Sequence, residues 1–142
     1  MTTEAVGVAK PLPVIDDLTR PFWDAAAHDR LAVQQCDACG HRQLPPSLTC
    51  VACRSRALSW VQVSGRGTVH TFTILHRAYH PAFADEVPYN VSIIELDEGP
   101  LLLSNVVGVP VDQLRIGQRV EVFFEPIGEG LALPKFAPVE AT

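Results

Sequence analysis

Four cysteines are the residues whose type and spacing most clearly allow chemistry. They form two Cys-X-X-Cys pairs, Cys36 with Cys39 and Cys50 with Cys53, separated by ten residues, and the chain has no other cysteine. Two thiolates spaced by two residues can both turn inward around one tight bend, here called a knuckle. Two knuckles facing each other supply the tetrahedral four-sulfur shell that zinc prefers. The sequence therefore predicts one zinc site.

Three other uses of the cysteines stay open. Disulfides require an oxidising compartment, and residues 1–12 contain no apolar run long enough for a signal peptide. A redox dithiol is usually a single pair beside a βαβ pattern, whereas here two pairs flank a hairpin that contains Pro45 and Pro46. Iron could occupy the same four-thiolate shell. Because four protein ligands leave no open position for water or substrate, we expect a structural metal.

Two segments in which apolar and polar residues alternate must position the knuckles. Residues 31–35 predict a strand that enters the first knuckle, and residues 58–63 predict a strand that leaves the second. A strand, a knuckle, a hairpin, a knuckle and a strand in this order make a zinc ribbon. Arg54 stands after the second knuckle where Gly40 stands after the first, and this difference removes no ligand.

A short helix is predicted before the ribbon. Residues 1–17 read as an irregular lead-in, Thr19 offers an N-cap, Pro21 suits a first helical turn, and the helix continues to residue 28. Such a helix is not stable alone, so Phe22 and Trp23 must pack on this chain's own barrel or on another subunit. We expect them to pack on another subunit, because two large aromatic side chains on a peripheral segment suit an interface anchor.

The second half of the chain predicts a small β-barrel. Five β-prone runs, at 68–75, 89–96, 101–107, 119–125 and 131–136, are separated by glycine- and proline-containing turns. Five antiparallel strands in this length favour an OB-fold, with an SH3-like barrel or a small sandwich as alternatives. We therefore expect three parts: an N-terminal extension and helix (1–30), a zinc ribbon (31–63) and an OB-fold (64–142).

One long connection, residues 76–88, contains two histidines and two aromatic residues. Loops of this content often bind something, although Tyr79 and Phe83 could instead form a structural flap over an open barrel end. An anion such as a phosphate would suit the nearby arginines. The candidate ligand-binding residues are Arg66, His76, Arg77, Tyr79, His80 and Phe83.

Composition and charge narrow the class of protein. The chain has 142 residues and 47% hydrophobic content, with no apolar stretch of membrane-spanning length, so we expect a soluble cytoplasmic protein. Its formal charge of −5 becomes about −7 once four thiolates hold a zinc ion. Residues 30–77 contain six arginines and one acid, so this segment is basic and the remainder is strongly acidic. The arginines either solvate a small ribbon or form a surface for an anion or an acidic partner.

The usual catalytic patterns are missing. The sequence contains no phosphate-binding glycine loop, dinucleotide fingerprint or nucleophile elbow. A cysteine nucleophile is excluded if all four cysteines bind metal. His76 or His80 could act as a base near Asp85, but no nucleophile accompanies them. We therefore expect no catalytic residue and no independent enzyme.

Taken together, the motifs resemble a zinc-ribbon OB-fold family catalogued as domain of unknown function number thirty-five. The resemblance runs from about residue 19 to 138, and its motifs match in order and spacing. They are Phe22-Trp23, the two knuckles, Trp60 with Ser64-Gly65-Arg66-Gly67, His76-Arg77 with Pro81-Ala82-Phe83 and Pro88-Tyr89, Leu96-Asp97-Glu98-Gly99-Pro100, Leu114-Arg115-Ile116-Gly117 and Leu133-Pro134-Lys135-Phe136.

The resemblance implies an N-terminal helical segment, a rubredoxin-like zinc ribbon and an OB barrel. It implies an accessory subunit that partners a thiolase-like enzyme, either a lipid-transfer-type thiolase or a steroid side-chain retro-aldolase, in a hetero-oligomer with acyl-CoA at the interface. Such proteins also occur fused to hydratase-like domains. The alternative function is binding of single-stranded nucleic acid, which zinc ribbons and OB-folds both serve. The acidic overall charge opposes nucleic acid, and we expect no membrane partner.

Overall fold

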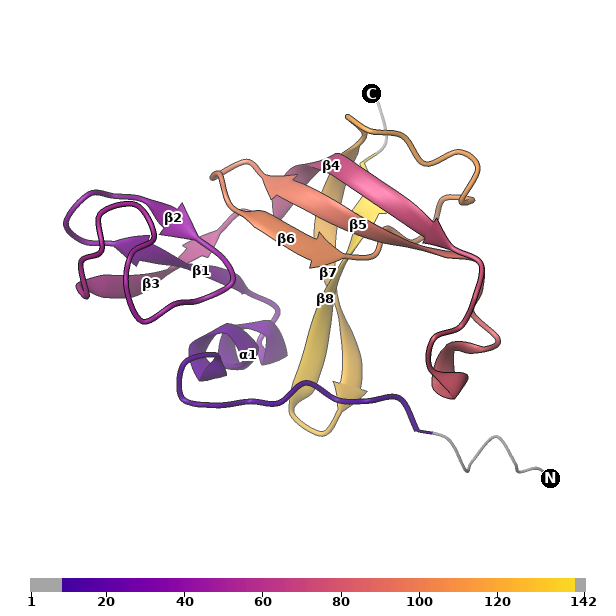
Figure 1. The fold of residues 1–142 in the computed structure, drawn as a ribbon, viewed down its shortest axis with the longest axis horizontal. Helices are drawn as coiled ribbons and strands as arrows, with labels where there is room; N and C mark the ends of the chain where they lie inside the picture. The colour runs from indigo at the N-terminus through magenta and orange to yellow at the C-terminus, as the bar shows by residue number, and fades with distance from the viewer. Residues whose placement is uncertain (1–8, 140–142) are drawn as a thin grey trace.

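The computed structural model describes residues 9–139. These residues form a short helix, a three-stranded sheet and a five-stranded sheet that curls into a half-open barrel (Figure 1). The helix contacts both sheets. The mainly β fold, with an N-terminal helix, a zinc ribbon and an OB barrel, is confirmed. The expected division at residues 30 and 63 stays a prediction.

Helix α1 (Arg20–Ala27) begins as the sequence indicates, with Pro21 in its first turn. Thr19 occupies the N-cap position, but its hydroxyl makes no capping hydrogen bond. Instead, Thr19 N donates to Asp16 Oδ1 at 2.8 Å, and Thr19 Oγ1 accepts from Asp16 N at 3.2 Å. The reciprocal pair closes the turn that precedes the helix. The predicted N-cap position is therefore confirmed, but the Thr19 hydroxyl does not cap the helix, because it is bonded to Asp16 instead.

The ribbon sheet has the order β2-β1-β3, with β1 (Leu31–Cys36), β2 (Arg42–Gln43) and β3 (Leu58–Val63) all antiparallel. The first knuckle lies in the turn between β1 and β2, and the second lies in the connection between β2 and β3. Both predicted strands are present. The two-residue β2 was not predicted, since such a strand is too short to show an alternating pattern.

The barrel sheet has the order β6-β5-β4-β7-β8, and each neighbouring pair is antiparallel. A parallel bridge between Val106 and Phe136 joins its two edges. Five strands closed in this way form the partly open barrel of an OB-fold. The strands are β4 (Arg66–Leu75), β5 (Tyr89–Leu96), β6 (Leu101–Ser104), β7 (Arg119–Gly128) and β8 (Leu131–Pro138), with a 3-10 turn η2 (Pro81–Phe83) between β4 and β5.

A buried asparagine holds the seam of the barrel. Asn90 is 5% exposed, and its Nδ2 donates to Val106 O at 2.7 Å while its Oδ1 accepts from Val106 N at 2.9 Å. Ser92 Oγ also donates to Asn90 Oδ1, at 2.7 Å. The segment after β6 therefore leaves the β5 ladder at Ser104 and is redirected toward β8. This explains why β6 is shorter than the predicted run to residue 107.

One hydrophobic core joins all three parts of the molecule. The ribbon and the barrel contribute to the same buried cluster, so the ribbon is packed against the barrel and not only linked to it. The members of this cluster are Phe22, Leu31, Val33, Val63, Val69, Ile94, Leu96, Val106, Leu114, Val120 and Phe136.

Candidate metal centre and ligand-binding surfaces

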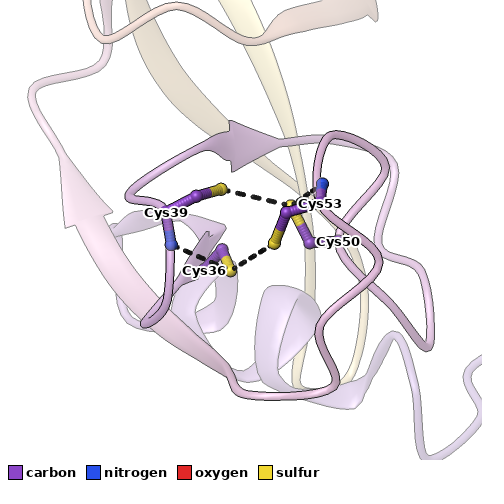
Figure 2. Close-up of side chains that lie close together, drawn as sticks. All are labelled: Cys36, Cys39, Cys50 and Cys53. Atoms are coloured by element: carbon purple, nitrogen blue, oxygen red, sulfur yellow. Dashed lines mark hydrogen bonds between the residues drawn. The ribbon is translucent and has the colours of Figure 1, made fainter.

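The four cysteine sulfurs converge between the two knuckles (Figure 2). All four Sγ atoms lie within 4.8 Å of one another. The Sγ–Sγ distance is 3.6 Å from Cys36 to Cys53 and 3.6 Å from Cys39 to Cys50. Sulfurs bound to one tetrahedral zinc at about 2.3 Å lie about 3.8 Å apart, whereas a disulfide requires about 2.05 Å. The donor set therefore fits a four-thiolate zinc site with no open position, and the predicted ligands are brought together.

Backbone amides favour the thiolate form of the leading cysteine in each knuckle. Cys39 N donates to Cys36 Sγ at 3.5 Å, and Cys53 N donates to Cys50 Sγ at 3.5 Å. These bonds are the main reason that the pKa of the Cys36 thiol falls to about 6 and that the pKa of the Cys50 thiol is lowered.

The second cysteine of the first knuckle behaves differently. The backbone amide of His41 acts to lower the pKa of the Cys39 thiol, but desolvation and the three neighbouring sulfurs outweigh it and raise that pKa to about 12. Four sulfurs this close favour a shared proton or a central cation over four free thiolates. A divalent metal supplies the positive charge that lets all four ionise.

Two buried glutamines hold the second knuckle against the ribbon sheet. Gln43 Nε2 donates to Gln34 Oε1 at 2.9 Å and to Thr49 O at 3.2 Å, and Gln43 Oε1 accepts from Val51 N at 2.9 Å. Gln34 also bonds both backbone groups of Ser47, at 2.8 and 3.0 Å. The connection from β2 to Cys50 is therefore positioned by side-chain amides. Sequence reasoning missed these residues, because a glutamine in a strand gives no sign of whether it faces solvent or a loop.

The two knuckles end in the same backbone conformation. Gly40 has φ of +81° and Arg54 has φ of +69°. Gly40 N donates to Cys36 O at 2.9 Å, and Arg54 N donates to Cys50 O at 2.8 Å. Gly40 and Arg54, which occupy equivalent places in the sequence of the two knuckles, therefore also have equivalent backbone conformations. A non-glycine residue in this left-handed region costs about 1 kcal/mol.

The two aromatic residues of α1 are placed differently from the expected interface anchor. Phe22 is 9% exposed and belongs to the core, while Trp23 is partly buried and packs edge-on against it, with ring centroids 5.1 Å apart. Phe22 therefore packs on this chain's own barrel, the alternative that we did not favour. A partner role for Phe22 and for Trp23 stays a prediction.

The six candidate ligand-binding residues do not form one site. Arg66 begins β4, and His76 and Arg77 follow its end, so roughly 30 Å of strand separates them at about 3.3 Å per residue. Arg66 Nε also lies 3.5 Å from Glu121 Oε2. Arg77 instead lies against the Tyr79 ring, 5.3 Å from its centroid. Arg66 and Arg77 therefore do not lie together, and a ligand role for each of them stays a prediction.

The rest of the loop forms a small aromatic cluster. The rings of His80 and Phe83 lie 6.0 Å apart, and the rings of Phe83 and Tyr89 lie 6.1 Å apart. His80 Nδ1 accepts from Ala82 N at 3.0 Å, which fixes the start of η2. Tyr79 is 74% exposed and stands apart from this cluster. A ligand role for the loop stays a prediction.

A groove of about 900 Å³ opens between the lead-in segment, η2 and the β7–β8 hairpin. In Figure 1 the lead-in passes close to the tip of this hairpin. Lys10 forms an ion pair with Glu86, and its Nζ lies 5.3 Å from the Phe83 ring centroid. Phe83 is the candidate ligand residue that lines the groove. The other lining residues come from four separate segments, so no sequence motif could have marked them.

Two family models match consecutive parts of this chain. The rubredoxin-like zinc ribbon domain of ChsH2 matches residues 23–59, and the C-terminal OB-fold domain of ChsH2 matches residues 60–125. A DUF35 domain-containing scaffold protein of Methanothermobacter thermautotrophicus is 32% identical over 100 residues, which span 70% of this chain and 74% of that protein. The chain belongs to the DUF35 family.

Two further similarities of this DUF35 chain are to proteins named as an enzyme or an enzyme subunit. It is 36% identical over 129 residues to a probable enoyl-CoA hydratase alpha subunit of Thermomonospora curvata, covering 91% of this chain and 40% of that protein. A solved structure of an Ltp2-ChsH2(DUF35) aldolase contains a chain with 35% identity and a TM-score of 0.81. That match covers 89% of this chain and 98% of that one. The DUF35 chain thus spans well under half of the hydratase subunit that it matches.

The family assignment agrees with the metal geometry, because the matched ribbon domain contains all four cysteines. The cofactor is zinc in a structural site. No helix in the described part of the DUF35 chain is long and apolar enough to cross a membrane.

Proposed function

We propose that this chain is a non-catalytic accessory subunit that binds and supports a thiolase-like enzyme acting on acyl-CoA. The partner would be a lipid-transfer-type thiolase or a steroid side-chain retro-aldolase, assembled with this chain as a hetero-oligomer in the cytoplasm, where thiols stay reduced. One observation carries the proposal. The match to the Ltp2-ChsH2(DUF35) aldolase structure covers 98% of the matched chain in that structure. The names of the hydratase alpha subunit and the scaffold protein support the same general role.

The chemistry of the chain itself supports a non-catalytic role. All four cysteines lie in a closed metal site. Within residues 9–139, no serine or threonine hydroxyl is hydrogen bonded to a histidine, so the pairing that activates a nucleophile is missing there. His80 uses its Nδ1 to accept from a backbone amide. The reacting groups of the proposed complex would therefore come from the partner.

The loop after β4 is the part of this chain that we propose to meet acyl-CoA. Arg77 has no carboxylate partner among the described residues, and Tyr79 beside it is mostly exposed. A guanidinium next to an exposed aromatic ring suits a nucleotide phosphate and base. Arg77→Ala should then raise the KM of the complex for acyl-CoA without dissociating it. Arg66→Ala is the matched control, since Arg66 lies at the far end of β4.

Purification from the native host tests the proposal as a whole. The tagged chain should co-elute with a thiolase-like subunit in size-exclusion chromatography, and it should bind a labelled single-stranded oligonucleotide negligibly at physiological salt. A nucleic-acid protein would instead bind the oligonucleotide with micromolar affinity that falls steeply as salt rises. Such binding, together with no enzyme subunit in the eluate, would overturn the proposal.

A further inference from the structure

Strand β5 has polar side chains inside and apolar side chains outside over residues 90–93, whereas further along the strand Ile94 and Leu96 face the core. Asn90 and Ser92 point into the barrel and are 5% and 0% exposed, whereas Val91 and Ile93 point outward. A barrel strand with one solvated face normally places apolar residues inside and polar residues outside. Inversion removes apolar side chains from the core and presents them to whatever lies outside the barrel.

The edge strand β6 continues this apolar surface. Leu103 pairs with Ile93 and Leu101 pairs with Glu95, so both leucines lie on the outward side. They are 65% and 44% exposed, while the intervening Leu102 packs against the core. The outward surface of Val91, Ile93, Leu101 and Leu103 is called the β5–β6 face below. In Figure 1 no other helix or strand lies in front of β5 and β6.

The β5–β6 face is apolar and also has a depression beside it. A depression of about 190 Å³ adjoins it, and Val91, Leu103 and Leu133 contribute to its lining. Asn105 and Leu133 contribute to the lining of both this depression and the 900 Å³ groove. A central apolar patch beside a small pocket is the arrangement that accepts anchor side chains from a protein partner.

The charges around the β5–β6 face indicate which kind of partner can bind it. Strands 2 and 3 of an OB-fold, here β5 and β6, form the surface that binds oligonucleotides in many such barrels, through basic and aromatic groups. Here that surface is aliphatic. Acids lie near both ends of β5 in the sequence, Asp85 and Glu86 before it and Glu95 and Asp97 at its end; Glu86 is paired with Lys10 and Asp97 with Arg119. Residues 64–139 contain nine acids and five lysines or arginines. A polyanion is therefore repelled, and a second copy of the chain would bring acids against acids.

We propose that the β5–β6 face docks the enzyme subunit, through a partner surface with an apolar centre and a basic rim. This inference rests on the proposed accessory function and names where the partner binds. It also replaces Phe22 as the anchor, since that side chain belongs to the core. Leu103 sits at the centre of the docking surface, and the adjoining depression receives a side chain of the partner.

The test compares Leu103→Asp with Ile116→Asp in the zinc-loaded chain of 142 residues. The two wild-type residues have nearly equal exposure, 65% and 68%, but Ile116 lies outside the β5–β6 face. Because Leu103 is exposed and outward, its replacement should leave zinc content and the far-ultraviolet circular dichroism unchanged. Burying a carboxylate in an apolar interface is costly, so the Kd for the co-purified thiolase-like subunit should rise about 100-fold or more. Ile116→Asp should change that Kd by less than about threefold.

Each outcome decides the question. A Kd for Leu103→Asp equal to that of the wild type overturns the docking surface but leaves the accessory function standing. If Leu103→Asp instead converts a self-associated wild-type chain into a monomer and leaves enzyme binding intact, the face binds a second copy and the proposal is wrong. A wild-type chain that binds no enzyme subunit overturns both proposals. Leu101→Asp should reproduce the loss of binding, which guards against an effect peculiar to one position.

Discussion

Replacing Gln43 by alanine should weaken zinc binding although Gln43 touches no sulfur. The side chain is 5% exposed and makes three hydrogen bonds, to Gln34 Oε1, Thr49 O and Val51 N. Val51 N belongs to the second knuckle, between Cys50 and Cys53. Without the glutamine, the knuckle keeps its covalent connection to β2 but loses the contact that fixes its orientation.

The magnitude follows from those three bonds. Each hydrogen bond contributes about 1 kcal/mol net, and a buried group left unpaired costs about 1 to 3 kcal/mol more. Val51 is 67% exposed, so water can reach its amide and reduce the second cost. We therefore expect a loss of about 2 to 4 kcal/mol from the unfolding free energy. Loss of a group that orients metal ligands typically lowers metal affinity about 10- to 100-fold.

Competition with a chelator of known affinity measures the zinc Kd, and urea unfolding measures the stability. Gln35→Ala is the matched control, because the same side chain there only accepts a bond from exposed Arg42, at 2.9 Å. That variant should keep zinc affinity within about twofold and lose less than about 0.5 kcal/mol. If Gln43→Ala behaves like the control, the glutamines do not orient the knuckle and the reasoning fails.

Three smaller predictions follow from single contacts. Arg54→Gly should stabilise the chain by about 1 kcal/mol in urea unfolding, and Gly40→Ala should destabilise it by about as much, because both positions have positive φ. Asn90→Ala should cost about 2 to 4 kcal/mol, since both backbone groups of Val106 lose their partner. Arg119 lowers the pKa of Asp97 below its ordinary 3.8, so their pair stabilises the fold above that pH. This contribution to stability should disappear as the pH falls through the lowered pKa of Asp97. In acid unfolding, the Asp97→Asn variant should lack this pH-dependent loss of stability.

The zinc ligands could be predicted from sequence because ligand spacing within a knuckle is a local property. Cys36 and Cys39 must turn inward together whatever the rest of the chain does. The ribbon and barrel strands were also predictable, since alternation and turn residues act over a few positions. The ends of strands were harder to predict. Strand β7 continues to residue 128, beyond the expected 125, because it pairs with β8 along the whole hairpin.

Properties that depend on long-range packing could not be predicted. Phe22 looks like an exposed anchor in sequence, and only the packing of α1 against β1 and β8 shows that it is buried. Arg66 and Arg77 are both candidate ligand residues in the sequence, and only the structure shows that the length of β4 separates them. The alternation of Val91, Ser92 and Ile93 was visible in the sequence. Which of its two faces enters the barrel is decided by pairing with β4 and by the seam at Asn90.

Turnover of acyl-CoA by separated and recombined subunits tests the accessory role most directly. The purified chain alone should show none, because residues 9–139 hold no activated nucleophile with an oriented base. Addition of the thiolase-like subunit should produce activity that depends on both proteins and saturates at their binding stoichiometry. Turnover by the lone chain that persists through further purification and is lost on mutation of one of its own residues would contradict the account.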